Sequence, residues 1–270
     1  DLKELADDEC KTEFRFFKDD IYRLSRVLRV PEFIICPNGV KVTGIEALCV
    51  YLKRFAYPCR YSDLIPRFAR DIPKICLISN AMMNHIYNDH HNLLENMDQS
   101  WLSREHLQLY ANAIHSKGAY LSNCWSFIDG TVRSVSRPRE NQRTVYNGHK
   151  RVHSLKFQSV VTPNGMMASL YGPLEGKRHD CAMLALSGIL PKLEENSFAS
   201  NGDPLCIFGD AAYPLRIRMQ RPFKGAGLTP SEKEFNRSMS RVRVSVEWLF
   251  GEIINYYNFL DFKKNIKIGL

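Results

Sequence analysis

The chain has 270 residues, of which 44% are hydrophobic and 24% are charged, with a net charge of +8. These proportions are ordinary for a globular protein, and they exclude a disordered, collagen-like or coiled-coil chain. No apolar run reaches the ~18 residues that a membrane-spanning helix needs. The first twenty residues carry too many acidic side chains for a secretory signal. We therefore expect no membrane segment, and the absence of an initial Met indicates a fragment or a processed product.

Eight cysteines are spread widely along the chain, and no two of them form a Cys-x-x-Cys pair. A chain of this length can bury a sufficient core without disulfides. We therefore expect reduced, buried thiols in an intracellular protein, rather than a disulfide framework or a zinc site.

Positive charge is concentrated in two stretches of the chain. Residues 131–160 contain seven basic residues against Glu140, and residues 211–245 contain eight basic residues against two acidic ones. Concentrated charge of one sign attracts polyanions, and neutralisation of phosphates dominates non-specific affinity for nucleic acids. The alternative is a solvated surface, and charge does not by itself separate the two.

Residues 1–120 are predicted to form a helical N-terminal region. Apolar residues recur at spacings of three and four over residues 12–28 and 44–56, which is typical of helices that pack by one face. Proline and glycine predict breaks between these helices at Pro31, Pro37-Asn38-Gly39 and Pro58.

Two short helical patterns between residues 62 and 87 flank residues 70–73, with Ser62 and Ser79 as candidate N-caps. They resemble a degenerate helix-turn-helix, whose second helix would enter the major groove of DNA. The second pattern is apolar and offers few basic or amide side chains, which favours simple helical packing instead.

Residues 121–270 are predicted to form an α/β domain with helices on the faces of a sheet. Strands are expected over residues 125–135, 156–162, 166–171 and 204–209, and a helix over residues 181–195. Pro163-Asn164-Gly165 predicts a hairpin turn. Thr229-Pro230-Ser231-Glu232 has the pattern of a capping box, and it precedes a helical stripe that runs to Tyr257.

Four acidic residues stand out by their positions. Asp129 and Asp210 follow apolar strands, Asp180 begins a predicted helix, and Glu247 lies within the last helix. Each has a structural explanation: Asp129 as a turn residue, Asp180 as an N-cap, Asp210 as a cap, and Glu247 as an ion-pair partner of Arg243.

Taken together, the acidic residues suggest chemistry. Asp129 and Asp210 both end apolar strands, where the side chains of an α/β sheet converge on a site. Carboxylates that meet there repel each other unless a cation joins them. Oxygen ligands select hard divalent ions such as Mg²⁺ or Mn²⁺. Two such ions can activate a nucleophile and stabilise the leaving oxygen of a phosphodiester.

The chain resembles the PIF/Harbinger transposase family, in particular the Harbinger transposase-derived nucleases of animals. The resemblance covers nearly the whole chain, and four strings in the right order make it specific. These are FIDGT at residues 127–131, HD at 179–180, GDAAYP at 209–214 and RVSVEWLFG at 243–251, supported by YNGHKR at 146–151 and LKRFAYP at 52–58.

The resemblance implies an RNase H-like core of the DDE superfamily: a mixed sheet with flanking helices, preceded by the helical N-terminal region. Asp129, Asp210 and Glu247 match the family's acidic triad. Asp180 matches a further metal-ligand position, so that the second triad member is either Asp180 or Asp210. The implied activity is hydrolysis of DNA phosphodiester bonds with two Mg²⁺ or Mn²⁺ ions. The candidate phosphate contacts are Lys150, Arg151, Arg241 and Arg243.

The resemblance also implies a nuclear protein and a separate Myb/SANT-type partner that supplies DNA recognition. Without such a partner the chain would remain in the cytoplasm. The family usually continues with a further helical segment, which leaves open whether the C-terminus of this chain is truncated. The rival functions are a catalytically silent DNA-binding or protein-interaction module and an RNase H-like enzyme acting on RNA. The retained carboxylates favour the nuclease, because a pure binding protein has no need of buried like charges.

Overall fold

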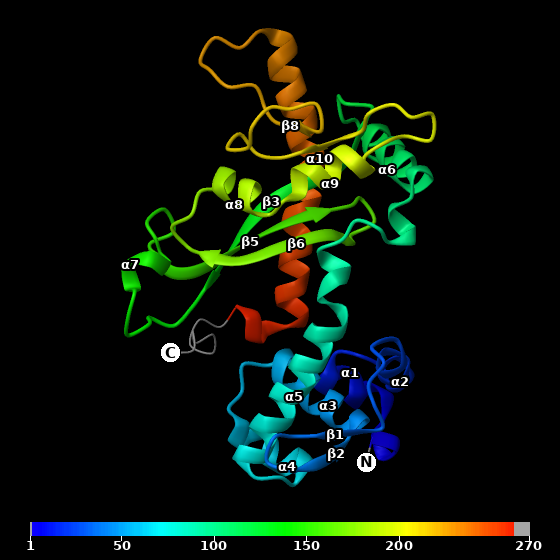
Figure 1. Cartoon of the computed structure of the whole chain (residues 1–270), viewed down its shortest axis with the longest axis vertical. Helices are drawn as coiled ribbons and strands as arrows, with labels where there is room; N and C mark the ends of the chain where they lie inside the picture. The colour runs from blue at the N-terminus through cyan, green and yellow to red at the C-terminus, as the bar shows by residue number, and fades with distance from the viewer. Residues whose placement is uncertain (1, 262–270) are drawn as a thin grey trace. The chain divides into compact units, whose positions relative to one another are not determined.

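The computed structural model describes residues 2–261, except for the side chain of Glu247. Contacts divide the chain into two compact units (Figure 1). Unit 1 comprises Asp1–Asn92 and the segment that begins at Ile253, and unit 2 comprises Leu93–Glu252. This division differs from the boundary expected near residue 120, because the helix over residues 104–116 packs within unit 2.

Unit 1 is built from helices and one small hairpin. Its elements are η1 (Leu2–Glu4), α1 (Asp7–Phe14), α2 (Lys18–Val27), β1 (Phe33–Ile35), β2 (Lys41–Thr43), α3 (Gly44–Ala56), η2 (Tyr61–Leu64), α4 (Ile65–Phe68), α5 (Ile72–His90) and η5 (Asn258–Leu260). The helix predicted over residues 44–56 is confirmed. The helix predicted over residues 12–28 is instead two helices, because Arg15 takes a left-handed conformation with φ of 68°.

The predicted helix-turn-helix is a packed pair in unit 1. Asp71 caps α5, since its Oδ1 accepts a hydrogen bond from the Lys74 backbone N–H at 2.9 Å. The caps predicted at Ser62 and Ser79 are therefore wrong: Ser62 lies inside η2, and Ser79 is buried in the middle of α5. The apolar face of α5 is buried against the other helices of the unit, and α4 has four residues. Packing explains this segment without DNA recognition.

Unit 2 contains a six-stranded mixed sheet. Its strands are β3 (Cys124–Ser134), β4 (Tyr146–Asn147), β5 (Val152–Val161), β6 (Met167–Glu175), β7 (Cys206–Phe208) and β8 (Met219–Gln220). The order is β4-β5-β3-β7-β8, and β6 also pairs with β5. Strand β3 runs antiparallel to β5 and parallel to β7. This is the mixed α/β, RNase H-like architecture expected from the sequence.

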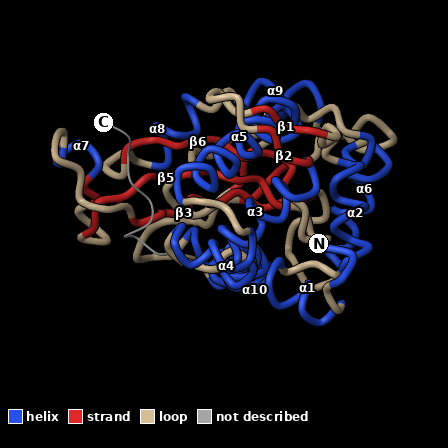
Figure 2. The backbone as a smooth tube through the Cα atoms, turned by 90° about the horizontal axis from the view of Figure 1, so that it is seen from below, coloured by secondary structure: helices blue, strands red, loops and turns tan. Residues whose placement is uncertain are grey.

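Helices cover both faces of this sheet, as Figure 2 shows for α10 on one side and α8 and α9 on the other. Trp125 and Ile128 of β3 are buried with residues of α8 and α9, and Phe127 is buried with residues of α10. The helices are η4 (Ser100–Leu102), α6 (Arg104–Ser116), α7 (Gln142–Val145), α8 (Asp180–Leu186), α9 (Ile189–Asn196) and α10 (Pro230–Tyr256). The helix predicted over residues 181–195 is divided at Gly188, whose φ is 62°.

Two local predictions for unit 2 are confirmed. The β5–β6 hairpin turns at Pro163-Asn164-Gly165, where Gly165 has φ of 81° and the Thr162 backbone N–H donates to Met166 O at 3.0 Å. The capping box at α10 is complete. The Thr229 backbone N–H donates to Glu232 Oε2 at 2.7 Å, and the Glu232 N–H donates to Thr229 Oγ1 at 3.3 Å.

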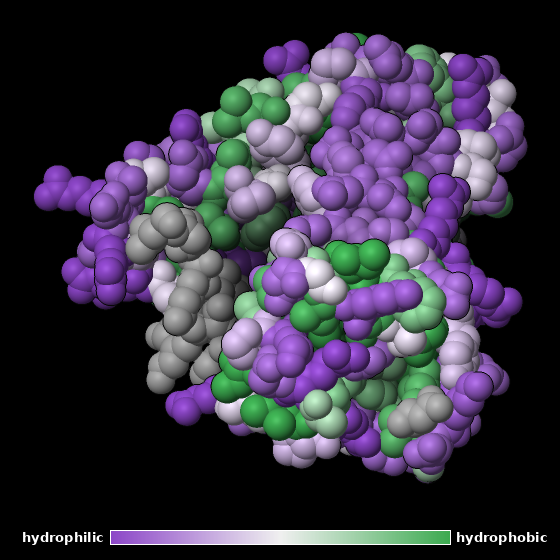
Figure 3. Space-filling model, turned by 60° about the horizontal axis from the view of Figure 1, so that its bottom comes forward, coloured by the Kyte–Doolittle hydropathy of each residue, from purple (hydrophilic) through white to green (hydrophobic). Residues whose placement is uncertain are grey.

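Apolar side chains reach the surface of unit 1. Val27 is 64% exposed and Ile35 is 70% exposed. Figure 3 shows green patches among purple ones on the face of unit 1 that is turned to the viewer.

Two expectations from composition concern membranes and thiols. Among the described helices, none combines the length and the apolar character that crossing a bilayer requires. The eight cysteines have no disulfide partner within the described part of the chain, and five of them are buried.

The capping box at α10 gives a first prediction. Thr229→Ala should lower the free energy of unfolding by about 0.5–2 kcal/mol, because it removes the side-chain cap of the helix. The hydrogen bonds from the Thr229 backbone N–H and hydroxyl lower the pKa of Glu232. Stabilisation from the charged box is therefore full at neutral pH and is lost as the pH falls through this lowered pKa.

Urea unfolding at neutral and acidic pH measures this effect. The control is Ser240→Ala, which changes an exposed residue of the same helix and should stay within about 0.5 kcal/mol. A Thr229→Ala cost that grows at acidic pH would contradict the assignment.

Candidate active site

Parallel pairing of β3 and β7 brings Asp129 and Asp210 to the same edge of the sheet. Phe127 of β3 pairs with Phe208 of β7, and each aspartate lies two residues after its phenylalanine. Asp129 remains within β3, opposite Ser159 of β5, so it is not a turn residue. Asp210 Oδ1 accepts a hydrogen bond from the Ala212 N–H at 2.8 Å, which also gives it the local capping role considered as an alternative.

Arg243 of α10 forms an ion pair with Asp129. Its Nη1 lies 3.2 Å from Asp129 Oδ1, and both side chains are 20% exposed. Burial raises the pKa of the Asp129 carboxyl and Asp210 raises it further, whereas Arg243 and the Gly130 N–H act to lower it.

Asp180 lies against the residue next to Asp129. It is the first residue of α8, after His179 at the N-cap, so it is not an N-cap itself. A Cβ atom at position 130 would lie 2.8 Å from Asp180 Oδ1, so glycine at this position leaves room for the carboxylate. The same Oδ1 lies 2.7 Å from Nζ of Lys156, which is buried on β5 and also donates to Arg178 O at 2.9 Å.

Tyr213 is a buried residue within electrostatic range of three of these acidic residues. Its side chain is 2% exposed, and its hydroxyl donates to Gln158 Oε1 at 3.4 Å. Burial raises the pKa of Tyr213 far above its ordinary value, and Asp180, Asp129 and Asp210 raise it further, in that order. Sequence reasoning missed Tyr213 and Lys156 as site residues, although Tyr213 lies in the GDAAYP string.

The donor set fits a hard divalent cation by its chemistry. Asp129 and Asp210 supply carboxylate oxygens at neighbouring strand ends, the type of ligand that Mg²⁺ and Mn²⁺ prefer. Among the side chains that the structure describes, no three His, Cys, Asp or Glu are arranged to hold a metal ion. The Glu247 side chain lies outside the described residues, and its position on α10 is one turn beyond Arg243.

The four candidate phosphate contacts are spread over unit 2. Lys150 and Arg151 are exposed in the turn before β5. Arg241 is exposed on α10, and its Nη2 donates to Lys117 O and Gly118 O at 3.5 Å. Arg243 is bound to Asp129, so it contributes to the acidic site as well as to the basic stretch.

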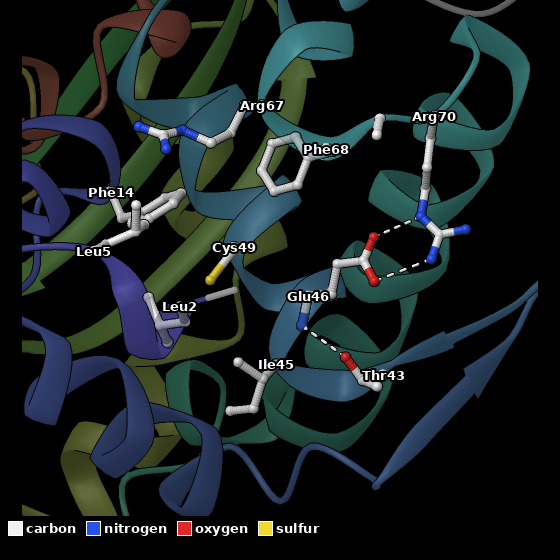
Figure 4. A pocket seen from close by; sticks show the side chains of 11 residues that line it. Leu2, Leu5, Phe14, Thr43, Ile45, Glu46, Cys49, Arg67, Phe68 and Arg70 are labelled. Atoms are coloured by element: carbon white, nitrogen blue, oxygen red, sulfur yellow. Dashed lines mark hydrogen bonds and ion pairs between the residues drawn. The ribbon is translucent and has the colours of Figure 1, made fainter.

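Unit 1 contains a separate cavity of about 750 Å³ (Figure 4). Its polar groups are paired with each other: Glu46 accepts hydrogen bonds from Arg70 Nε at 2.5 Å and from Arg70 Nη2 at 3.0 Å. Burial raises the pKa of the Cys49 thiol in its wall to about 12. This thiol is therefore protonated at neutral pH and is a poor nucleophile, so the cavity is not a candidate active site.

Comparison with known proteins agrees with the geometry of unit 2. Residues 128–270 match the family described as DDE superfamily endonuclease. The chain belongs to this family. A probable transposase for insertion sequence element IS702 from Microchaete diplosiphon is 27% identical over 127 residues, which are 44% of this chain and 42% of that protein. No solved structure matches the chain. These findings support a DDE nuclease or transposase-type enzyme, a superfamily that generally uses divalent metal ions.

The Lys156–Asp180 pair gives a second prediction. Lys156→Met should lower the free energy of unfolding by about 1–3 kcal/mol, because it leaves the Asp180 carboxylate without its buried cation. Combining it with Asp180→Asn should recover part of this loss, as a double-mutant cycle by urea unfolding would show. The control Lys177→Met changes an exposed lysine nearby and should have an effect within about 0.5 kcal/mol. Additive effects of the two substitutions would show that the pair does not form.

Proposed function

We propose that the chain is a metal-dependent DNA endonuclease of the transposase type, which hydrolyses phosphodiester bonds by a two-metal mechanism. The observation that supports the proposal is the parallel pairing of Phe127 with Phe208 in a member of the DDE endonuclease family, since Asp129 and Asp210 each follow one of these phenylalanines by two residues. The two basic stretches supply the charge that a polyanionic substrate requires.

Each site residue has a role in this proposal. Asp129 and Asp210 hold the divalent ions, Glu247 is the third ligand from α10, and Asp180 completes or orients the site. Bound divalent ions supply an activated water and stabilise the leaving oxygen. Arg243 balances the charge of Asp129, to which it is hydrogen-bonded, and is close enough to the acidic site to contact a phosphate there. Lys150, Arg151 and Arg241 hold phosphates further along the DNA.

A catalytically silent binding module is the second candidate, and a specific observation favours it. Asp129 is paired with Arg243 and Asp180 with Lys156, so protein cations already neutralise two of the acidic residues. A site that has lost its chemistry could keep such pairs for stability. Removing one partner of a buried ion pair costs more stability than replacing both partners with apolar residues.

Plasmid nicking in Mg²⁺ or Mn²⁺ separates the two candidates. The wild type should nick supercoiled DNA, and Asp129→Asn should lose more than the ~10–100-fold that removal of an outer-shell partner costs. The control Asp203→Asn changes an exposed aspartate of unit 2 and should leave the rate unchanged. Equal nicking by the wild type and Asp129→Asn would assign the activity to a contaminant. Absence of nicking in the wild type would favour the silent module.

The finer assignment rests on the sequence resemblance. We propose that the chain belongs to the PIF/Harbinger branch, acts with a Myb/SANT-type partner and reaches the nucleus through it. Imaging the tagged chain with and without such a partner tests this proposal, and a partner-independent distribution would contradict it.

A further inference from the structure

Unit 2 contains a cavity of about 550 Å³ that the proposed chemistry does not use. This volume lies in the range of ~300–1,000 Å³ that is typical of small-molecule sites. Its lining comes from the segment before β3, from the β7–β8 loop, from β8, from the β8–α10 loop and from the first turns of α10. The lining includes Tyr120, Gln220, Arg221, Phe223, Lys224 and Phe235.

Three aromatic rings form one wall of this cavity. Phe235 is buried, and it packs edge-on against Tyr120 at 5.3 Å and against Phe223 at 5.1 Å between ring centroids. Tyr120 is 54% exposed and Phe223 is 45% exposed. Phe235 thus holds two exposed rings in place, and exposed rings of this kind stack on unpaired nucleobases.

Two basic residues, Arg221 and Lys224, line the cavity together with the aromatic rings. Residues 211–224 include four basic side chains and no acidic one. Arg221 donates from Nη1 to Ala211 O at 3.5 Å, and its buried Nε has no hydrogen-bond acceptor among the described residues. Glu232 also lines the cavity, but Thr229 engages its carboxylate in the capping box. The cavity therefore combines stacking rings with charge that suits a phosphate chain.

The cavity lies next to the acidic residues through the β7–β8 ladder. Gln220 of β8 pairs with Phe208 of β7, and the Gly209 N–H donates to Gln220 O at 2.9 Å. Asp210 is the next residue after Gly209. The hydrogen bond from Arg221 to Ala211 O joins the two sites a second time.

We propose that this cavity binds an unpaired nucleobase of a DNA strand whose backbone continues to the carboxylates of Asp129 and Asp210. The inference rests on the proposed function, and it adds single-stranded or locally melted DNA as the preferred substrate. A base within a duplex must first be unstacked, which costs a few kcal/mol, whereas an unpaired base presents its face directly. The basic side chains hold the flanking phosphates, and Tyr120 and Phe223 stack on the base.

Binding in EDTA tests the cavity without any catalysis. The probe is a short single-stranded DNA that contains one 2-aminopurine, compared with its duplex and with RNA of the same sequence. The full chain should bind the single strand more tightly than the duplex and quench the 2-aminopurine fluorescence. Phe223→Leu should weaken single-strand binding by roughly 5- to 100-fold, in the range that loss of a stacking ring produces, and should leave duplex binding unchanged.

Two further variants guard against a folding defect. Phe223→Tyr keeps the aromatic face and should retain binding and quenching. Tyr87→Leu removes an exposed ring in unit 1 and should have no effect. Thermal melting of each variant checks that the fold is intact. Unchanged single-strand affinity in both Phe223→Leu and Tyr120→Leu would overturn the proposal, as would tighter binding of the RNA than of the DNA.

The outcome is separable from that of the nuclease proposal. If the wild type does not nick plasmid but Phe223→Leu loses single-strand binding, the cavity proposal stands and the endonuclease proposal is rejected. If nicking depends on Asp129 but single-strand binding is unchanged in both Phe223→Leu and Tyr120→Leu, the endonuclease proposal stands and the cavity proposal is rejected.

Discussion

Parallel pairing of β7 with β3 is the constraint on which the candidate site depends. It joins segments that are far apart in the sequence, and its register, with Phe127 opposite Phe208, brings Asp129 and Asp210 to the same edge of the sheet. A shift of one residue would turn one of the two side chains to the other face of the sheet. The buried phenylalanines pack against α10 and thereby protect this register.

Buried carboxylates are costly to ionise, and two protein cations partly offset this cost. Burial raises the pKa of Asp129 even though Arg243 acts to lower it, so the cost of removing this charge from water exceeds the compensation. Lys156 plays the corresponding part for Asp180. A buried ion pair gives little net stability by comparison with well-packed apolar residues. Net stability alone therefore does not explain why both pairs are present, and either the proposed chemistry or the cost of breaking an existing pair accounts for them.

The sequence predicted much of the fold because its strongest signals are local. The apolar strands of unit 2, the Pro163-Asn164-Gly165 turn and the Thr229 capping box depend on neighbouring residues, and all are present. The helix breaks at Arg15 and Gly188 were missed, because a left-handed residue inside an apolar pattern leaves the spacing almost intact. The β1–β2 hairpin around Gly39 was taken only as a break, since its strands are three residues long.

Prediction of the site was limited by contacts between distant residues. Asp129 and Asp210 were predicted as site residues because strand ends and motif strings are visible in the sequence. Lys156 and Tyr213 were missed, because a lysine on a strand and an aromatic residue in a loop reveal their partners only after folding. The division into units depends on such contacts as well, since α6 looks like the preceding helices in sequence but packs into the unit 2 core in space.

The central claim is that Asp129 and Asp210 together hold a divalent ion, and calorimetric titration of the full chain with Mn²⁺ tests it most directly. The account predicts saturable binding in the wild type and in the control Asp203→Asn, and its loss in both Asp129→Asn and Asp210→Asn. Binding that survives in either of these two variants with unchanged affinity would contradict the claim, because it would place the ion elsewhere in the protein.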